Sequence, residues 1–89
     1  MRTIHKFTLL HISWKGSLQI PKGAQFCGFD FQNERPTLWF EVDTAQFTEN
    51  RNFEVVGTGA DVPNGGQHLA SVQVYDDRYW VWHLYEVVK

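Results

Sequence analysis

Two neighbouring runs of alternating polar and apolar residues lie in the segment PKGAQFCGFDFQNERPTLWFEVD, residues 21–43. The first run covers residues 25–32 and the second covers residues 37–43. One parity of the first run carries Cys27, Phe29 and Phe31, and one parity of the second run carries Leu38, Phe40 and Val42. A polar, turn-type connection, Asn33–Pro36, separates the runs. This pattern predicts an antiparallel hairpin with one face turned towards a core.

The rest of the chain repeats this kind of pattern at intervals of about ten residues, which is typical of a β-sandwich or a small barrel. The predicted strands are residues 2–12, 17–20, 25–32, 37–43, 52–58, 69–75 and 79–88. The last of these is apolar on both faces, so we expect it to be a central strand or part of an interface. We therefore predict an all-β fold, a small antiparallel sandwich or partly open barrel of about seven strands. At 89 residues, the chain is expected to form one domain, residues 1–89.

Composition excludes several classes of function. The net charge of −2 argues against general nucleic-acid binding, which needs a basic excess or a basic face. The single cysteine, Cys27, excludes an intrachain disulfide and a zinc site built from several cysteines. Because Cys27 shares the apolar parity of its strand, we expect a buried, inert thiol. No apolar run approaches the roughly 20 residues that span a bilayer, so we expect a cytoplasmic protein without membrane contact.

Residues capable of acid–base or metal chemistry are dispersed along the chain. The four histidines are His5, His11, His68 and His83. We expect packing residues with hydrogen-bonded ring nitrogens, and we predict no metal site and no cofactor. The alternative is a zinc site assembled from these dispersed histidines. The acidic residues on the polar face of the hairpin are Asp30, Glu41 and Asp43. They could form a carboxylate pair or a surface network of ion pairs. We predict no catalytic residues and a protein that is not an enzyme.

A glycine-rich connection follows the fifth predicted strand, and its backbone amides could cradle a phosphate group. The candidate ligand-binding residues there are Gly57, Thr58, Gly59, Asn64 and Gly65. The alternative interpretation is structural: Gly57 and Gly59 let a strand bend, and Asn64-Gly65 makes a tight turn. The segment lacks the Lys-Ser/Thr step of the specific phosphate-binding motifs.

Aromatic residues are the strongest candidates for a binding surface. Trp39 lies on the polar face of its strand, and the last strand carries Trp80 and Trp82 on one face with Tyr79 and Tyr85 on the other. One small core cannot bury both faces of that strand, so some rings should be exposed or lie in an interface. The predicted partner-binding residues are Trp39, Tyr79, Trp80 and Trp82. The alternative is an aromatic core covered by loops.

A series of short motifs spans almost the whole chain. They are Ile4 with Lys6-Phe7, Pro21–Ala24, Gln32-Asn33, Leu38-Trp39, Val42-Asp43, Arg51 with Phe53, Gly57-Thr58-Gly59 and Trp82-His83. In order and spacing, the chain resembles a family of small phage- and bacterium-encoded proteins of unknown function. In that family a histidine often follows the second glycine of Gly-Thr-Gly, where this chain has Ala60. The resemblance implies a compact β-domain of phage or prophage origin and supplies no catalytic residues.

The predicted function is non-enzymatic binding. A phage-type accessory protein of this kind would bind a host or phage protein and could inhibit a host defence system. A homodimer through the last strand is compatible with this role. The alternative is capture of a nucleotide or another phosphorylated ligand by the loop of residues 57–66. A hydrolase built on Asp30, Glu41 or His83 is the third alternative.

Overall fold

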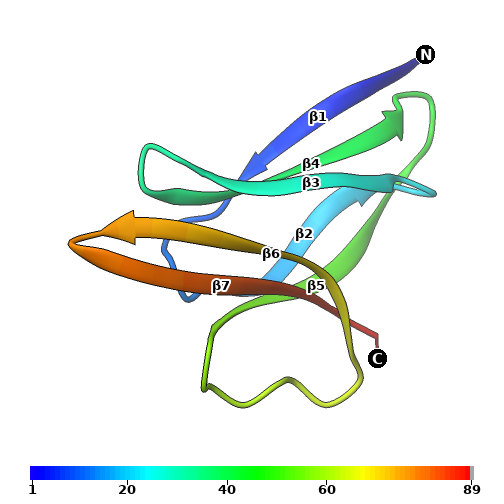
Figure 1. Cartoon of the computed structure of the whole chain (residues 1–89). Coiled ribbons are helices and arrows are strands. Elements are labelled where there is room, and N and C mark those ends of the chain that lie inside the picture. Colours follow the sequence, from blue (N-terminus) through cyan, green and yellow to red (C-terminus); the bar gives the residue numbers. More distant parts are fainter. Residues whose placement is uncertain (89) are drawn as a thin grey trace.

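The computed structural model describes residues 1–88, which form seven strands in two antiparallel sheets (Figure 1). The strands are β1 (Arg2–Thr8), β2 (Lys15–Pro21), β3 (Gln25–Gln32), β4 (Arg35–Asp43), β5 (Thr48–Gly57), β6 (Gly66–Asp76) and β7 (Arg78–Val87). All seven predicted strands are confirmed. The first strand is shorter than predicted, because β1 ends at Thr8 and residues 9–14 form a loop. Over residues 1–88, no helix has the length and apolar character needed to cross a membrane.

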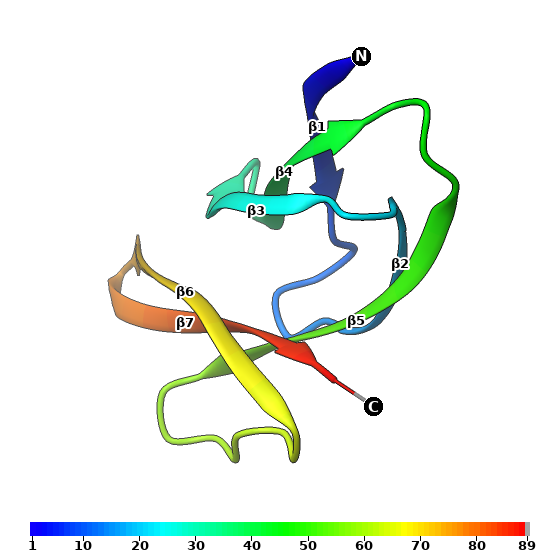
Figure 2. The ribbon, with the colours of Figure 1, turned by 90° about the vertical axis from the view of Figure 1, so that its right-hand side faces the viewer.

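The two sheets pack face to face as a sandwich. One sheet has the strand order β1-β4-β3 and the other has the order β2-β5-β7-β6. Figures 1 and 2 show β3 of the first sheet running near β6 of the second, although no ladder of hydrogen bonds joins them into a closed barrel. Strand β7 is paired with β5 on one side and β6 on the other. The prediction that it is a central strand is confirmed, but pairing on both edges does not cover its outer face, where Tyr79 is exposed.

The core lies between the two sheets and is centred on Phe40. This side chain is completely buried and meets Phe7, Phe26 and Phe53 edge to face, with ring centroids 5.6–5.9 Å apart. Aromatic pairs in this geometry contribute beyond the area they bury. The buried cluster is Leu9, Ile20, Ala24, Phe29, Leu38, Phe40, Val42, Phe53, Val55 and Leu84. These residues come from both sheets, so the hydrophobic effect holds the layers together.

The side chain of Arg51 links three segments at the edge of the core. The Arg51 guanidinium on β5 donates to both carboxylate oxygens of Glu86 on β7, at 2.7 and 2.8 Å. It also donates to the carbonyl oxygen of Ala24, which precedes β3 in the other sheet, at 2.8 Å. The guanidinium lies over the rings of Phe40 and Phe53, and its bonds to Glu86 raise the pKa of Arg51 despite its partial burial. This contact therefore ties the two sheets together at the end where β3 begins.

The turn between β3 and β4 is shorter than the sequence predicts. Gln32 pairs directly with Arg35, so the connection has two residues, Asn33 and Glu34, instead of the four predicted. Both residues have positive φ angles, 50° and 66°. This is the geometry of a type I′ turn, whose twist matches that of the flanking strands. Asparagine tolerates such angles, whereas glutamate does so at a conformational cost.

The prediction that Cys27 is buried is wrong. A β-bulge between Phe26 and Gly28 leaves Cys27 as the extra residue on β3, and its side chain is exposed. The bulge shifts the parity of the strand by one residue, so Phe26 and Phe29 both point into the core. The uninterrupted alternation read from the sequence therefore does not exist in the fold.

We predict that Glu34→Gly stabilises the protein by about 0.5–1 kcal/mol. Glycine adopts a positive φ without the steric cost that glutamate has there, and this gain exceeds the additional backbone entropy that glycine loses on folding. Urea unfolding of the two proteins measures this difference. Gln32→Gly is the matched control, because it places glycine inside a strand next to the turn and should destabilise by a similar amount. A destabilised Glu34→Gly variant would contradict the turn geometry.

We also predict that Cys27 reacts with a chromogenic thiol reagent in the native protein. Since the side chain is exposed, the native rate should approach that of the urea-unfolded chain, with one thiol modified per molecule. Cys27→Ser provides the blank. Labelling that requires prior unfolding would show that the bulge does not expose the thiol.

Removal of the Arg51 guanidinium should lower the free energy of unfolding far more than removal of an exposed cation. We predict that Arg51→Met lowers the free energy of unfolding by about 3 kcal/mol, because Glu86 is left largely buried without its partner. Arg2→Met is the control, since Arg2 forms an exposed pair with Glu41 and its removal should lower the free energy of unfolding by less than about 1 kcal/mol. Equal effects of the two substitutions in denaturant unfolding would refute the role given to Arg51.

Candidate functional site

The β6–β7 hairpin presents a group of aromatic side chains at its tip. The ring of Tyr75 contacts that of Tyr79, with centroids 4.9 Å apart, and both side chains are exposed. The guanidinium of Arg78 lies 5.4 Å from the centre of the Trp80 ring, and 47% of the surface of Trp80 is exposed. Exposed aromatic and arginine side chains of this kind often anchor protein–protein interfaces.

A groove of about 700 Å³ lies beside this hairpin tip. It opens at the end of the sandwich where the β3–β4 and β6–β7 hairpins both turn, the left end of Figure 1. Its lining is mainly apolar: Ile12, Phe31, Glu34, Val74, Tyr75, Trp80 and Trp82. Its walls come from both sheets and from the loop after β1. The groove therefore continues the apolar interior of the sandwich to the surface.

Trp82 lies on the inner face of β7 and packs against the core cluster. A Cβ atom on Gly57 would come within 3.2 Å of its ring, so the absence of a side chain at residue 57 leaves room for the indole. The Nε1–H of Trp82 is buried and has no hydrogen-bond acceptor within residues 1–88. A buried donor without an acceptor costs about 1–3 kcal/mol. An acceptor supplied from outside would recover part of this cost.

The four predicted anchor residues do not form one surface. Trp80 and Trp82 line the groove, and Tyr79 contacts the groove residue Tyr75. Trp39 lies on β4 in the other sheet, opposite Lys6 on β1 and Gly28 on β3, where it is half-buried on the outer face. The groove lining does not include it. The structure thus separates Trp39 from the other three.

The glycine-rich connection between β5 and β6 uses its backbone groups within the protein. The amide of Thr58 donates to the carbonyl of Val81, and the amide of Ala60 donates to that of Gly57. Gly65 has a φ of 72° at the third position of a tight turn closed by the bond from Gly66 N–H to Pro63 C=O. The tight turn predicted at Asn64-Gly65 is confirmed.

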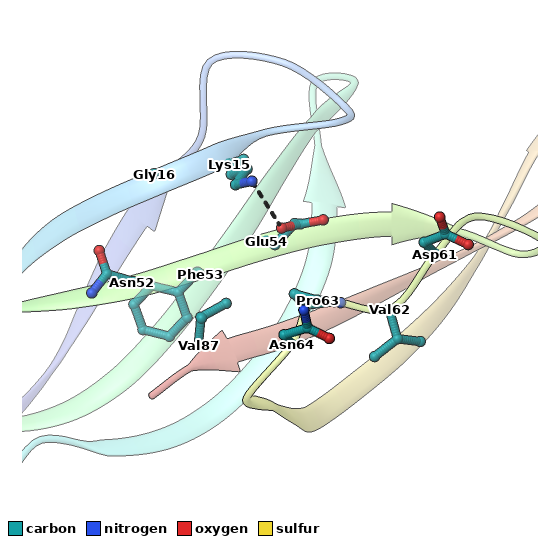
Figure 3. Close-up of a pocket in the computed structure, with 10 residues that line it drawn as sticks. All are labelled: Lys15, Gly16, Asn52, Phe53, Glu54, Asp61, Val62, Pro63, Asn64 and Val87. Carbon is teal, nitrogen blue, oxygen red and sulfur yellow. Dashed lines mark ion pairs between the residues drawn. The ribbon is translucent and has the colours of Figure 1, made fainter. Parts of the chain in front are cut away.

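A second pocket, of about 690 Å³, lies under this connection, and Asn64 is part of its lining (Figure 3). The other residues drawn around it include Lys15 and Glu54, joined by an ion pair of 3.8 Å, and Asp61. The lining thus contains two carboxylates and one lysine whose charge is offset by Glu54. Such a balance disfavours a phosphate group. Capture of a phosphorylated ligand by this loop stays a prediction without support from the charge of the pocket.

The three acidic residues of the predicted hairpin are engaged separately. Glu41 accepts a bond of 2.7 Å from Arg2, and Asp30 accepts from the amide of Phe31. Asp43 accepts from the amide of Ala45, and this bond holds the pKa of Asp43 below its ordinary value. Their recorded partners are cations and backbone amides. The arrangement matches the ion-pair alternative better than a catalytic carboxylate pair.

A polar cluster that the sequence analysis did not identify lies on the outer face of the second sheet. Ser71 Oγ lies 2.8 Å from His68 Nε2 and 2.6 Å from His83 Nδ1, and His83 Nε2 lies 2.9 Å from Thr58 Oγ1. The expectation that His83 has hydrogen-bonded ring nitrogens is confirmed. Sequence patterns could not predict this cluster, because His68 and His83 come together only through the pairing of β6 with β7. Within residues 1–88 no group of three or more histidine, cysteine or acidic residues is arranged to hold a metal ion.

Comparison with known proteins assigns the chain to a family but not to an activity. No curated protein and no solved structure matches it. One family model matches residues 1–89, the full length of the chain, and its description names no activity, substrate or source. The phage origin implied by the short motifs therefore stays a prediction. Because the match covers every residue, the chain belongs to the family described as Domain of unknown function (DUF7352).

Proposed function

We propose that this protein is a non-enzymatic binding protein that holds a protein partner in the groove at the hairpin end of the sandwich. The observation that carries the proposal is the position of Trp80. Its ring is half-exposed at the rim of a mainly apolar groove that leads to the partly buried Trp82. An apolar side chain of a partner would enter the groove and displace water from these rings.

The energetics of such a contact favour a protein partner. Burial of apolar surface contributes about 25 cal/mol per Å², and Trp, Tyr and Arg dominate the binding energy of protein interfaces. The hairpin tip supplies all three residue types, with Arg78 held against Trp80. Binding that opens the groove and brings a carbonyl oxygen to Trp82 Nε1 would also satisfy an unpaired donor.

The biological setting of this proposal follows the resemblance to phage-encoded proteins. In that setting the protein is an accessory factor, and its partner is a host or phage protein. A component of a host defence system is one such partner, and occupation of its surface would inhibit it. The single small domain suits a role that requires binding without chemistry.

We predict that Trp80→Ala weakens binding of groove ligands at least tenfold without unfolding the protein. The ligands are peptides selected from a displayed random library against the immobilised wild-type chain. The expected peptides carry a large apolar anchor. Trp39→Ala is the matched control, because it removes the same side chain from the outer face of the other sheet and should leave peptide affinity unchanged.

The indole N–H signals of the four tryptophans, recorded by NMR, report where the peptides bind. The signals of Trp80 and Trp82 should shift on binding, and that of Trp39 should not. Peptides that bind Trp80→Ala as tightly as wild type would refute the groove as the binding surface. A wild-type dimer that Trp80→Ala converts to a monomer, measured by light scattering, would assign the groove to self-association instead.

A further inference from the structure

The His68–Ser71–His83 cluster depends on a β-bulge in β6. His68 pairs with Tyr85 and Ser71 pairs with His83, while the register shifts by one residue between His68 and Ala70. Residues three apart would normally face opposite sides of a sheet. The bulge keeps His68 and Ser71 on the same face, where both meet His83. Bulges often redirect a side chain in this way next to functional sites.

The hydrogen bonds assign a tautomer to each imidazole. Thr58 Oγ1 lies 3.3 Å from the carbonyl oxygen of Val81, which can only accept, so the Thr58 hydroxyl donates to it. Thr58 Oγ1 then accepts from His83 Nε2–H, which leaves a lone pair on His83 Nδ1. Ser71 Oγ–H donates to that lone pair and accepts from His68 Nε2–H. With both imidazoles neutral, this is the direction of the chain that satisfies all four contacts at once.

From this geometry we propose a metal site in which His83 Nδ1 and His68 Nε2 bind one divalent ion of the zinc, nickel or copper class. Both nitrogens already lie within 2.8 Å of the same oxygen atom, Ser71 Oγ. Once the Ser71 side chain rotates away, small rotations of the two rings would bring each nitrogen to about 2.0–2.1 Å from an ion near the position that Oγ leaves. His68 would transfer its Nε2 proton to Nδ1 to free the second lone pair. Solvent water would fill the remaining coordination positions.

The surroundings of His83 suit such a ligand. Histidines that bind metals usually donate their other ring N–H to a fixed acceptor, which sets the tautomer and the ring orientation. Thr58 Oγ1 is that acceptor for His83 Nε2–H. The ring of Tyr85 meets His68 edge to face at 5.4 Å and restricts its orientation. Neutral imidazole pairs favour zinc, nickel and copper over calcium and magnesium, which prefer oxygen ligands.

The test is a titration of tag-free protein with ZnCl2 by isothermal calorimetry, in a Cys27→Ser background that removes the exposed thiol. We expect one Zn²⁺ per chain. His68→Ala and His83→Ala should each weaken binding at least tenfold. The matched controls are His5→Ala and His11→Ala, which remove histidines outside the cluster and should leave the affinity unchanged. Ser71→Ala should retain binding, because the serine only occupies the two nitrogens in the absence of metal.

NMR of the imidazole nitrogens keeps the proposal testable if His83→Ala unfolds. In the Cys27→Ser protein, Zn²⁺ should shift His68 Nε2 and His83 Nδ1 and leave the other two histidines unchanged. Absence of binding at millimolar Zn²⁺ would overturn the proposal. Equal losses on substitution of His5 or His11 would do the same, because they would show non-specific binding to surface histidines.

Discussion

The side chain of Arg51 links the two sheets, which share no ladder of hydrogen bonds, because it pairs with Glu86 in its own sheet and also donates to the Ala24 carbonyl before β3 of the other sheet. Arg51 joins the two central strands of one sheet to the start of β3 in the other, beneath the rings of Phe40 and Phe53. A partly buried guanidinium is stable there because Glu86 and the Ala24 carbonyl satisfy it and aromatic faces cover it. The contact lies at the end of the sandwich where β3 begins, and it adds a directional hydrogen bond between the sheets to hydrophobic burial, which is non-directional.

The opposite end of the sandwich remains open, and the candidate binding groove lies there. The two hairpins that form its rim turn through residues with positive φ, Glu34 and Asp77, so their strands run in tight pairs to the very tip. The aromatic residues of β7 exceed what the core can cover, which leaves Trp80 half-exposed. The Arg51 contact and the candidate binding groove thus lie at opposite ends of the sandwich. Substitutions at the rim of the groove can alter the binding of a partner without affecting the Arg51 contact at the other end.

Several of the short motifs that define the family resemblance contact one another in the structure. The carbonyl of Ala24 accepts from Arg51, Gly57 lies against the ring of Trp82, and Thr58 bonds to His83. Each of these contacts joins segments that are distant in the sequence, which gives the spacing of the motifs a structural reason. The contact of Thr58 with His83 also orients one ligand of the proposed metal site.

Local alternation was enough to predict the number and type of the strands, since period-2 patterning and turn residues act within a few residues of chain. It also indicated that the last strand is central or part of an interface, and that exposed tryptophans are candidate anchors. Strand order, the two bulges and the short turn at Asn33-Glu34 were decided by the tertiary structure. A bulge arises from the register with a partner strand, and no local pattern records that register. For this reason the sequence determined an antiparallel β-domain rich in exposed rings, whereas only the packed strands exposed Cys27, separated Trp39 from Trp80 and brought His68 to His83.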